Sequence, residues 1–104
     1  MDIYLLYVTY KDRQQAQEIS KILVEARLVA CANIFPAHES LYWWDGAVQN
    51  ATETAVLYKT RAENFAAVEA KIKAFHSYEC PCIVALPIEK GYKPFLDWIS
   101  REVL

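Results

Sequence analysis

The chemically most capable stretch of the sequence is His76-Ser77-Tyr78-Glu79, which places an imidazole three residues before a carboxylate. An imidazole with a carboxylate can hold a borderline transition metal or relay a proton. His76 also follows a predicted helix, where a cationic histidine commonly does no more than complement the dipole and the last carbonyls. We therefore predict His76 as a metal ligand and Tyr78 and Glu79 as ligand-binding residues, with the helix-end role as the alternative.

The three cysteines suggest a second kind of site. Cys80-Pro81-Cys82 supplies two thiols, and Cys31 is a candidate third. A structural zinc site needs four ligands, so this set is incomplete, and free cysteines more often behave as small buried hydrophobic residues. An odd number of cysteines without an export signal is typical of reduced thiols, so we expect a cytoplasmic location.

The hairpin predicted over residues 28–60 is the element that must position these groups. Asp45-Gly46 is typical of a tight hairpin turn. The first arm, residues 29–44, is expected to bend or break at Pro36, and its sixteen residues would extend roughly 53 Å. A compact chain of 104 residues is only about 33 Å across. The hairpin should therefore extend beyond its domain and expose the aromatic residues at 42–44, which something else must cover.

Four hairpin residues are further binding candidates. Trp43, with Trp44 beside it, is predicted to anchor a subunit interface, with stacking on a ligand ring as a compatible role. Glu53 and Lys59 are six residues apart and share one strand face, either as a polar pair in a cleft or as a solvated surface. Together with Asn33, we expect them to reach from a neighbouring subunit towards the His76 loop, because loops at strand ends present polar groups.

The remaining elements are predicted from hydrophobic periodicity. The apolar run over residues 3–10 is typical of a central strand, and residues 82–88 form another strand. Asp12 with Gln15, and Thr60 with Glu63, resemble capping boxes that begin amphipathic helices. The predicted helices cover residues 13–27, 61–75 and 93–103, the last with Phe95, Trp98, Ile99 and Val103 facing inward.

This order of elements indicates an α+β fold. Two β-α-β units joined through a hairpin give a ferredoxin-like βαββαβ sandwich, here with an extended β-hairpin and an added C-terminal helix. The length predicts a single domain over residues 1–104.

Composition argues against several classes of function. Eleven Lys and Arg against thirteen Asp and Glu give a net charge of −2, without the basic stripe of a nucleic-acid binder. The apolar runs are too short to span a bilayer, and the N-terminus lacks a basic region typical of a signal peptide. With two glycines in the chain, and neither a phosphate-binding loop nor a nucleophile elbow, we expect no enzyme activity.

Several motifs together resemble the CutA divalent-cation tolerance family, and the resemblance covers essentially the whole chain. They are Ala30-Cys31-Ala32-Asn33-Ile34, Ser40, Tyr42-Trp43-Trp44, Gly46, Glu53, Lys59-Thr60, His76-x-Tyr78-x-x-Pro81 and Gly91-x-x-x-Phe95-Leu96-x-Trp98-Ile99. The resemblance implies a ferredoxin-like homotrimer of unusual stability, a role in tolerance to copper and other divalent metals, and a regulatory or signalling role. In animal members it implies a scaffolding association at cell membranes. It implies no catalytic reaction.

Two positions depart from the family pattern. The copper ligation proposed for the family uses a cysteine in the first strand and two adjacent histidines after the second helix, where this chain has Val8 and the pair Phe75-His76. Three interpretations stay open. They are a regulatory trimer with copper or another divalent cation or a small ligand bound between subunits, a structural trimer that scaffolds an unknown protein partner, and a small enzyme using His76 and Glu79.

Overall fold

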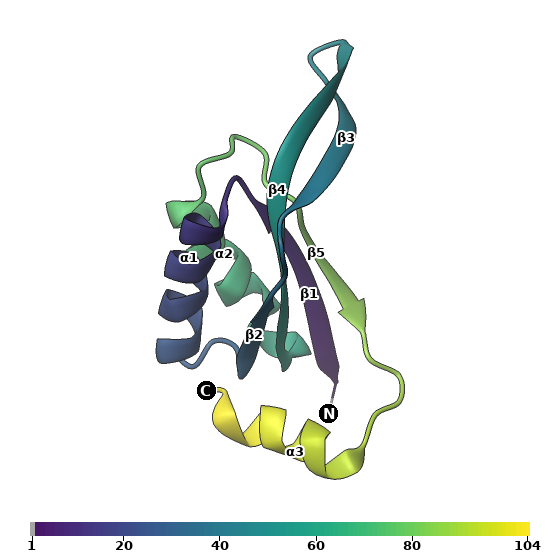
Figure 1. Cartoon of the computed structure of the whole chain (residues 1–104). Helices are drawn as coiled ribbons and strands as arrows, with labels where there is room; N and C mark the ends of the chain where they lie inside the picture. Colours follow the sequence, from purple (N-terminus) through teal and green to yellow (C-terminus); the bar gives the residue numbers. More distant parts are fainter. Residues whose placement is uncertain (1) are drawn as a thin grey trace.

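A computed structural model describes residues 2–104 of the chain (Figure 1). The strands and helices in chain order are β1 Ile3–Tyr10, α1 Arg13–Glu25, β2 Cys31–Ile34, β3 His38–Trp44, β4 Ala47–Arg61, the 3₁₀ turn η1 Ala62–Asn64, α2 Phe65–Phe75, β5 Ile83–Pro87 and α3 Lys93–Glu102. Among these residues, no helix combines the length and hydrophobicity that crossing a bilayer requires.

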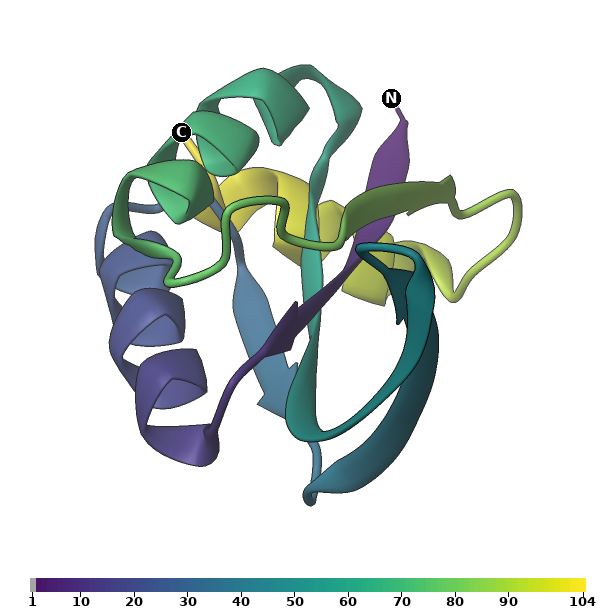
Figure 2. The same cartoon turned by 90° about the horizontal axis from the view of Figure 1, so that it is seen from above.

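The strands of residues 2–104 form a five-stranded antiparallel sheet in the order β2-β4-β1-β5, with β3 paired to the outer part of β4. Helices α1 and α2 lie side by side on one face of this sheet (Figures 1 and 2). The apolar strand β1 lies between β4 and β5, which confirms its predicted central position. The predicted α+β class and ferredoxin-like sandwich are thereby confirmed.

The core lies between the sheet and these two helices. Alternate residues of β1 and β4 face the helices, because neighbouring side chains of a strand point to opposite faces. The core residues are Leu6, Val8, Tyr10, Ala16, Ile19, Leu23, Val29, Val56, Tyr58, Val68 and Ile72.

A chain of hydroxyl groups crosses this core. Tyr10 Oη and Tyr58 Oη are 2.6 Å apart, and Tyr58 Oη is 2.8 Å from Ser20 Oγ. Each hydroxyl therefore has a partner where water is excluded. Burial raises the pKa of both tyrosines above the ordinary value of 10.0, so both phenols stay protonated in the folded protein.

Helix α1 begins as predicted and ends earlier. The Asp12 carboxylate accepts a hydrogen bond of 2.8 Å from the Gln15 backbone amide, as expected of an N-cap. At the other end, Arg27 takes a φ of 58°, and the Leu28 amide donates to the Leu23 carbonyl at 3.1 Å. This left-handed residue stops the helix at Glu25, two residues before the predicted end.

The predicted capping box at Thr60 and Glu63 is wrong. Thr60 lies in β4, and its hydroxyl donates a 2.7 Å hydrogen bond to the Leu28 carbonyl. Asn64 is the N-cap of α2 and makes no side-chain capping bond. Strand β4 therefore continues through Thr60 and Arg61, where the local sequence predicts a helix cap and the first helical residue. Helix α2 begins only at Phe65.

The hairpin is present with the predicted turn and the predicted break. Asp45 and Gly46 have φ angles of 53° and 78°, and residues 35–37 separate β2 from β3. The pair β3–β4 extends away from the rest of the sheet (Figure 1), and the molecule measures 44 × 26 × 24 Å along its principal axes. Trp43 on this pair is 75% exposed.

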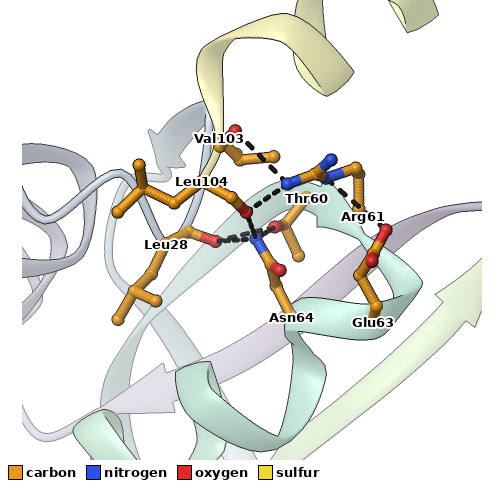
Figure 3. A network of polar contacts seen from close by, with 7 residues as sticks. All are labelled: Leu28, Thr60, Arg61, Glu63, Asn64, Val103 and Leu104. Atoms are coloured by element: carbon orange, nitrogen blue, oxygen red, sulfur yellow. Dashed lines mark hydrogen bonds and ion pairs between the residues drawn. The ribbon is translucent and has the colours of Figure 1, made fainter.

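Helix α3 lies across the end of the sheet opposite the hairpin (Figure 1). Figure 3 shows how the chain end is held there: Arg61 Nη2 donates to the carbonyls of Val103 and Leu104, and Asn64 Nδ2 donates to the Leu104 carbonyl at 3.3 Å. Ile99 and Val103 are buried as predicted. The predicted inward position of Phe95 is wrong, since its ring stacks on Trp98 and remains 42% exposed.

We expect the free energy of unfolding to fall as pH rises above about 10, because Tyr10 and Tyr58 ionise in the unfolded chain before they can ionise in the folded one. Their contribution is fully present below that pH. Each group then lowers the free energy of unfolding by about 1.4 kcal/mol per pH unit until its folded-state pKa is reached. Urea unfolding between pH 8 and 11 measures this slope, which should become shallower in Tyr10→Phe than in the surface control Tyr92→Phe. A stability independent of pH over this range would contradict the prediction.

Candidate functional site

A cavity of about 600 Å³ opens where the hairpin leaves the sheet. Ser40, Tyr42 and Trp44 of β3 line one side, and Glu53 of β4 lies next to them. The segment 77–80, with Cys82 and Thr9, lines the rest. A cavity of this size is typical of a small-molecule site.

The turn at Asp45-Gly46 decides which hairpin side chains reach this cavity. It pairs Trp44 with Ala47, and the same register pairs His38 with Glu53. Paired residues in an antiparallel ladder share a face, so the even-numbered residues of β3 lie on the face of Glu53. Tyr42 and Trp44 therefore line the cavity, whereas Trp43 points to the opposite face. Our sequence analysis chose Trp43 as the binding residue, considered Trp44 only beside it and left out Tyr42, although the turn position contained this information.

Glu53 and Tyr78 form the polar centre of the cavity. Glu53 is only 7% exposed, and Tyr78 Oη donates a 2.7 Å hydrogen bond to its Oε2. Burial raises the pKa of Tyr78, and the adjacent Glu53 carboxylate raises it further, with smaller contributions from Tyr42 and Asp12. The phenol is therefore a permanent donor, and the carboxylate accepts its hydrogen bond.

The cysteines do not form one cluster. Cys80 and Cys82 are exposed and line the cavity, so the alternative that they are small buried hydrophobic residues is wrong. Cys31 lies in β2, which β4 and β1 separate from β5. Partial burial raises the pKa of the Cys82 thiol and the Glu53 charge raises it further, against a hydrogen bond with Thr9 that lowers it.

His76 holds the loop through both ring nitrogens. Its Nδ1 accepts a 3.0 Å hydrogen bond from the Tyr78 amide, so Nε2 carries the proton and donates to the Thr9 carbonyl at 2.8 Å. The ring stacks on Tyr10 with a centroid distance of 5.0 Å. A metal ion on His76 would have to replace one of these hydrogen bonds. Within residues 2–104, no group of three or more His, Cys, Asp or Glu side chains is arranged to hold a metal ion.

The other predicted residues lie apart from this cavity. Lys59 Nζ donates to Asn33 Oδ1 across the β2–β4 pair. Lys59 is six residues from Glu53, which is about 20 Å along a strand, so sharing a strand face does not bring these two residues together. Within one chain the structure thus brings together Glu53, Tyr78 and Glu79 at the cavity. Glu53 comes from the same chain as Tyr78, where we expected it to come from a neighbour.

The sequence pattern of a family described as "CutA1 divalent ion tolerance protein" matches residues 4–102. The chain belongs to the CutA1 family. The divalent-cation tolerance protein CutA of Archaeoglobus fulgidus is 50% identical over 98 residues, which are 94% of this chain and 95% of the relative. The family is named for tolerance and not for a catalysed reaction.

Solved structures of family members share the fold. The structure of CutA from Archaeoglobus fulgidus, described as periplasmic, has a TM-score of 0.95 at 47% identity and covers 98% of this chain and 99% of its own. CutA1 from Oryza sativa has a TM-score of 0.97 at 33% identity and covers 100% of this chain and 95% of its own.

We expect His76→Ala to destabilise the protein by about 2 kcal/mol, because two hydrogen bonds to backbone groups are lost. Amide hydrogen exchange should show faster exchange of the Tyr78 amide and its neighbours in the 77–82 segment. His38→Ala on the hairpin is the matched control and should leave this segment unchanged. Equal exchange in the two variants would show that His76 does not hold the loop.

Proposed function

We propose that the protein is a homotrimer that acts in the response to divalent metal ions, copper among them, by binding a cation or a small ligand next to a subunit boundary. Its regulatory or signalling role would follow from that occupancy. Family membership supports the connection to divalent cations. The projecting hairpin is the observation that supports assembly into a trimer.

The hairpin exposes several large apolar side chains. Leu41, Trp43 and Val48 are all exposed on the two-stranded extension, which projects from the rest of the sheet (Figure 1). Contiguous apolar patches of this kind mark interaction surfaces. Symmetric closure by further copies of the chain would cover them without leaving an open end.

The edge of the sheet offers a place for a neighbour. β5 is the last strand in the order β2-β4-β1-β5, and its Val84 and Leu86 are exposed. An unpaired strand edge is a template for pairing with another chain. Because Cys82 immediately precedes β5 and lines the cavity, a neighbour on this edge would lie beside the cavity. Asn33, Trp43 and Lys59 are the residues that a neighbouring copy would contribute in this proposal.

The metal part of the proposal concerns His76. The ring would have to exchange one of its two hydrogen bonds for a metal ion, and further ligands would have to come from another subunit. Both requirements lower the affinity, so we expect weak binding. We also propose a cytoplasmic location, because exposed Cys80 and Cys82 suit a reducing compartment. Cell fractionation tests this location.

We expect sedimentation equilibrium at micromolar concentration to give about 36 kDa, three times the 12.0 kDa chain. Trp43→Ala should weaken the assembly by about 2 kcal/mol or more, because truncating a large interface aromatic residue commonly does so. Its melting temperature should then depend on protein concentration. Tyr92→Phe, at an exposed ring near α3, is the control. A monomer mass for the unmodified protein would contradict the proposal.

We expect calorimetric titration of the reduced protein to show weak binding that favours Cu²⁺ over Zn²⁺, following the general affinity order. His76→Ala should remove it. The comparison is a triple variant with Cys31→Ala, Cys80→Ala and Cys82→Ala, which should retain it. Loss of copper binding in the cysteine variant alone would show that thiolates, and not the imidazole, hold the metal.

A further inference from the structure

We propose that the cavity between β3, β4 and the 77–82 segment binds a small organic cation, namely a compound with an ammonium group attached to an apolar body. The rings of Tyr42, Trp44 and Tyr78 line the same cavity as one buried carboxylate, that of Glu53, to which Tyr78 donates a hydrogen bond. This inference rests on the proposed function only in taking the cavity as a ligand site, and it names the class of ligand.

The charge of the lining selects against anions. Glu53 and Glu79 are the carboxylates that line the cavity, and neither Lys nor Arg is among the lining residues of the described chain. Tyr78 keeps its proton and adds no compensating charge. A phosphate or carboxylate ligand would enter a partly buried space that already holds like charge, which is unfavourable. A cation would neutralise it.

The carboxylate of Glu53 keeps one oxygen for a ligand. Tyr78 donates to Oε2, and among residues 2–104 no other hydrogen bond to this carboxylate is present. A buried carboxylate with spare acceptor capacity is stabilised by a donor that also carries positive charge. An ammonium group supplies both.

The aromatic walls distinguish an organic cation from a bare metal ion. Ammonium groups bind favourably against the faces of Trp and Tyr rings, and cages of such rings are a known means of recognising them. A metal ion instead needs several oxygen, nitrogen or sulfur ligands, and within residues 2–104 no three His, Cys, Asp or Glu side chains are arranged to hold one, those of the cavity included. The cavity volume of about 600 Å³ also leaves room for an apolar body next to the half-exposed Trp44 ring.

The test compares three compounds of similar shape and different charge. They are 2-phenylethylamine, 2-phenylethanol and 3-phenylpropanoate, each titrated into the full-length protein by calorimetry at neutral pH and low salt. We expect the amine to bind at least ten times more tightly than the alcohol, and the carboxylate not to bind. Equal binding of amine and alcohol, or preferred binding of the carboxylate, would overturn the inference.

Variants assign the binding to the named residues. Glu53→Gln keeps the size of the side chain and removes its charge, and should weaken amine binding at least tenfold. Glu39→Gln is the matched control, because Glu39 lies on β3 outside the cavity lining, where Asn50 donates to it. If Glu53→Gln fails to fold, Tyr42→Leu on the exposed hairpin replaces it and should weaken binding by a similar factor. Unchanged affinity in the folded variant would overturn the inference.

The cysteines give an independent readout inside the same protein. Cys80 and Cys82 line the cavity and Cys31 does not. Bound amine should slow alkylation of Cys80 and Cys82 by iodoacetamide, measured by mass spectrometry, while Cys31 reacts at its original rate. Equal slowing at all three sites, or at none, would overturn the inference.

The experiments distinguish a wrong organic-cation site from a wrong proposed function. The mass in solution and the copper titration without amine test the proposed function, whereas the amine titrations without metal test the cavity. A copper-binding trimer that ignores the amine would refute the organic-cation site alone.

Discussion

The structure depends on the continuity of strand β4. Its residues Ala47–Arg61 form one unbroken strand, yet its partners change along its length. The outer part of β4, up to Glu53, pairs only with β3. From Thr54 onward β4 pairs with β1 on one side, and from Val56 to Lys59 it also pairs with β2 on the other side. The outer part is thus a two-stranded ribbon without a sheet behind it. Such ribbons are marginally stable alone, which is the physical argument for the proposed assembly with other copies.

Glu53 lies at the residue where β4 changes partners. It pairs with His38 of β3, and the next residue, Thr54, pairs with Tyr10 of β1. The side chain is therefore covered by the end of the sheet and still faces the open base of the hairpin. A carboxylate buried there needs a donor, and Tyr78 provides it. Tyr78 is in turn held by the His76 ring, which binds Thr9 and stacks on Tyr10. The cavity is consequently built on the central strand of the core.

The sequence predicts most of the elements and only part of the site. The continuous apolar run identified the central strand, hydrophobic periodicity identified the helices, and Asp45-Gly46 identified the hairpin turn. Such patterns failed at Thr60, where pairing with Tyr4 of β1 outcompetes a local helix cap, and at Phe95, which no part of the described chain buries. Strand alternation correctly placed Glu53 and Lys59 on one face of β4. It does not show that pairing with β1 ends between these two residues, which leaves Glu53 at the cavity and Lys59 within the sheet. The pairing of Glu53 with Tyr78 joins residues 25 apart and appears only once the loop is folded.

The same geometry has different consequences for the two proposed cation sites, His76 and Glu53. A metal ion on His76 would replace one of the hydrogen bonds that hold the 77–82 segment. Metal binding at His76 would therefore loosen this segment of the same chain. Glu53 has no such conflict, because its free oxygen is not needed to hold the fold. A metal on His76 would release the Tyr78 amide or the Thr9 carbonyl, and both residues line the cavity. Occupancy of the imidazole by metal would therefore disturb the cavity walls, and the two proposed sites would be coupled through the loop that they share.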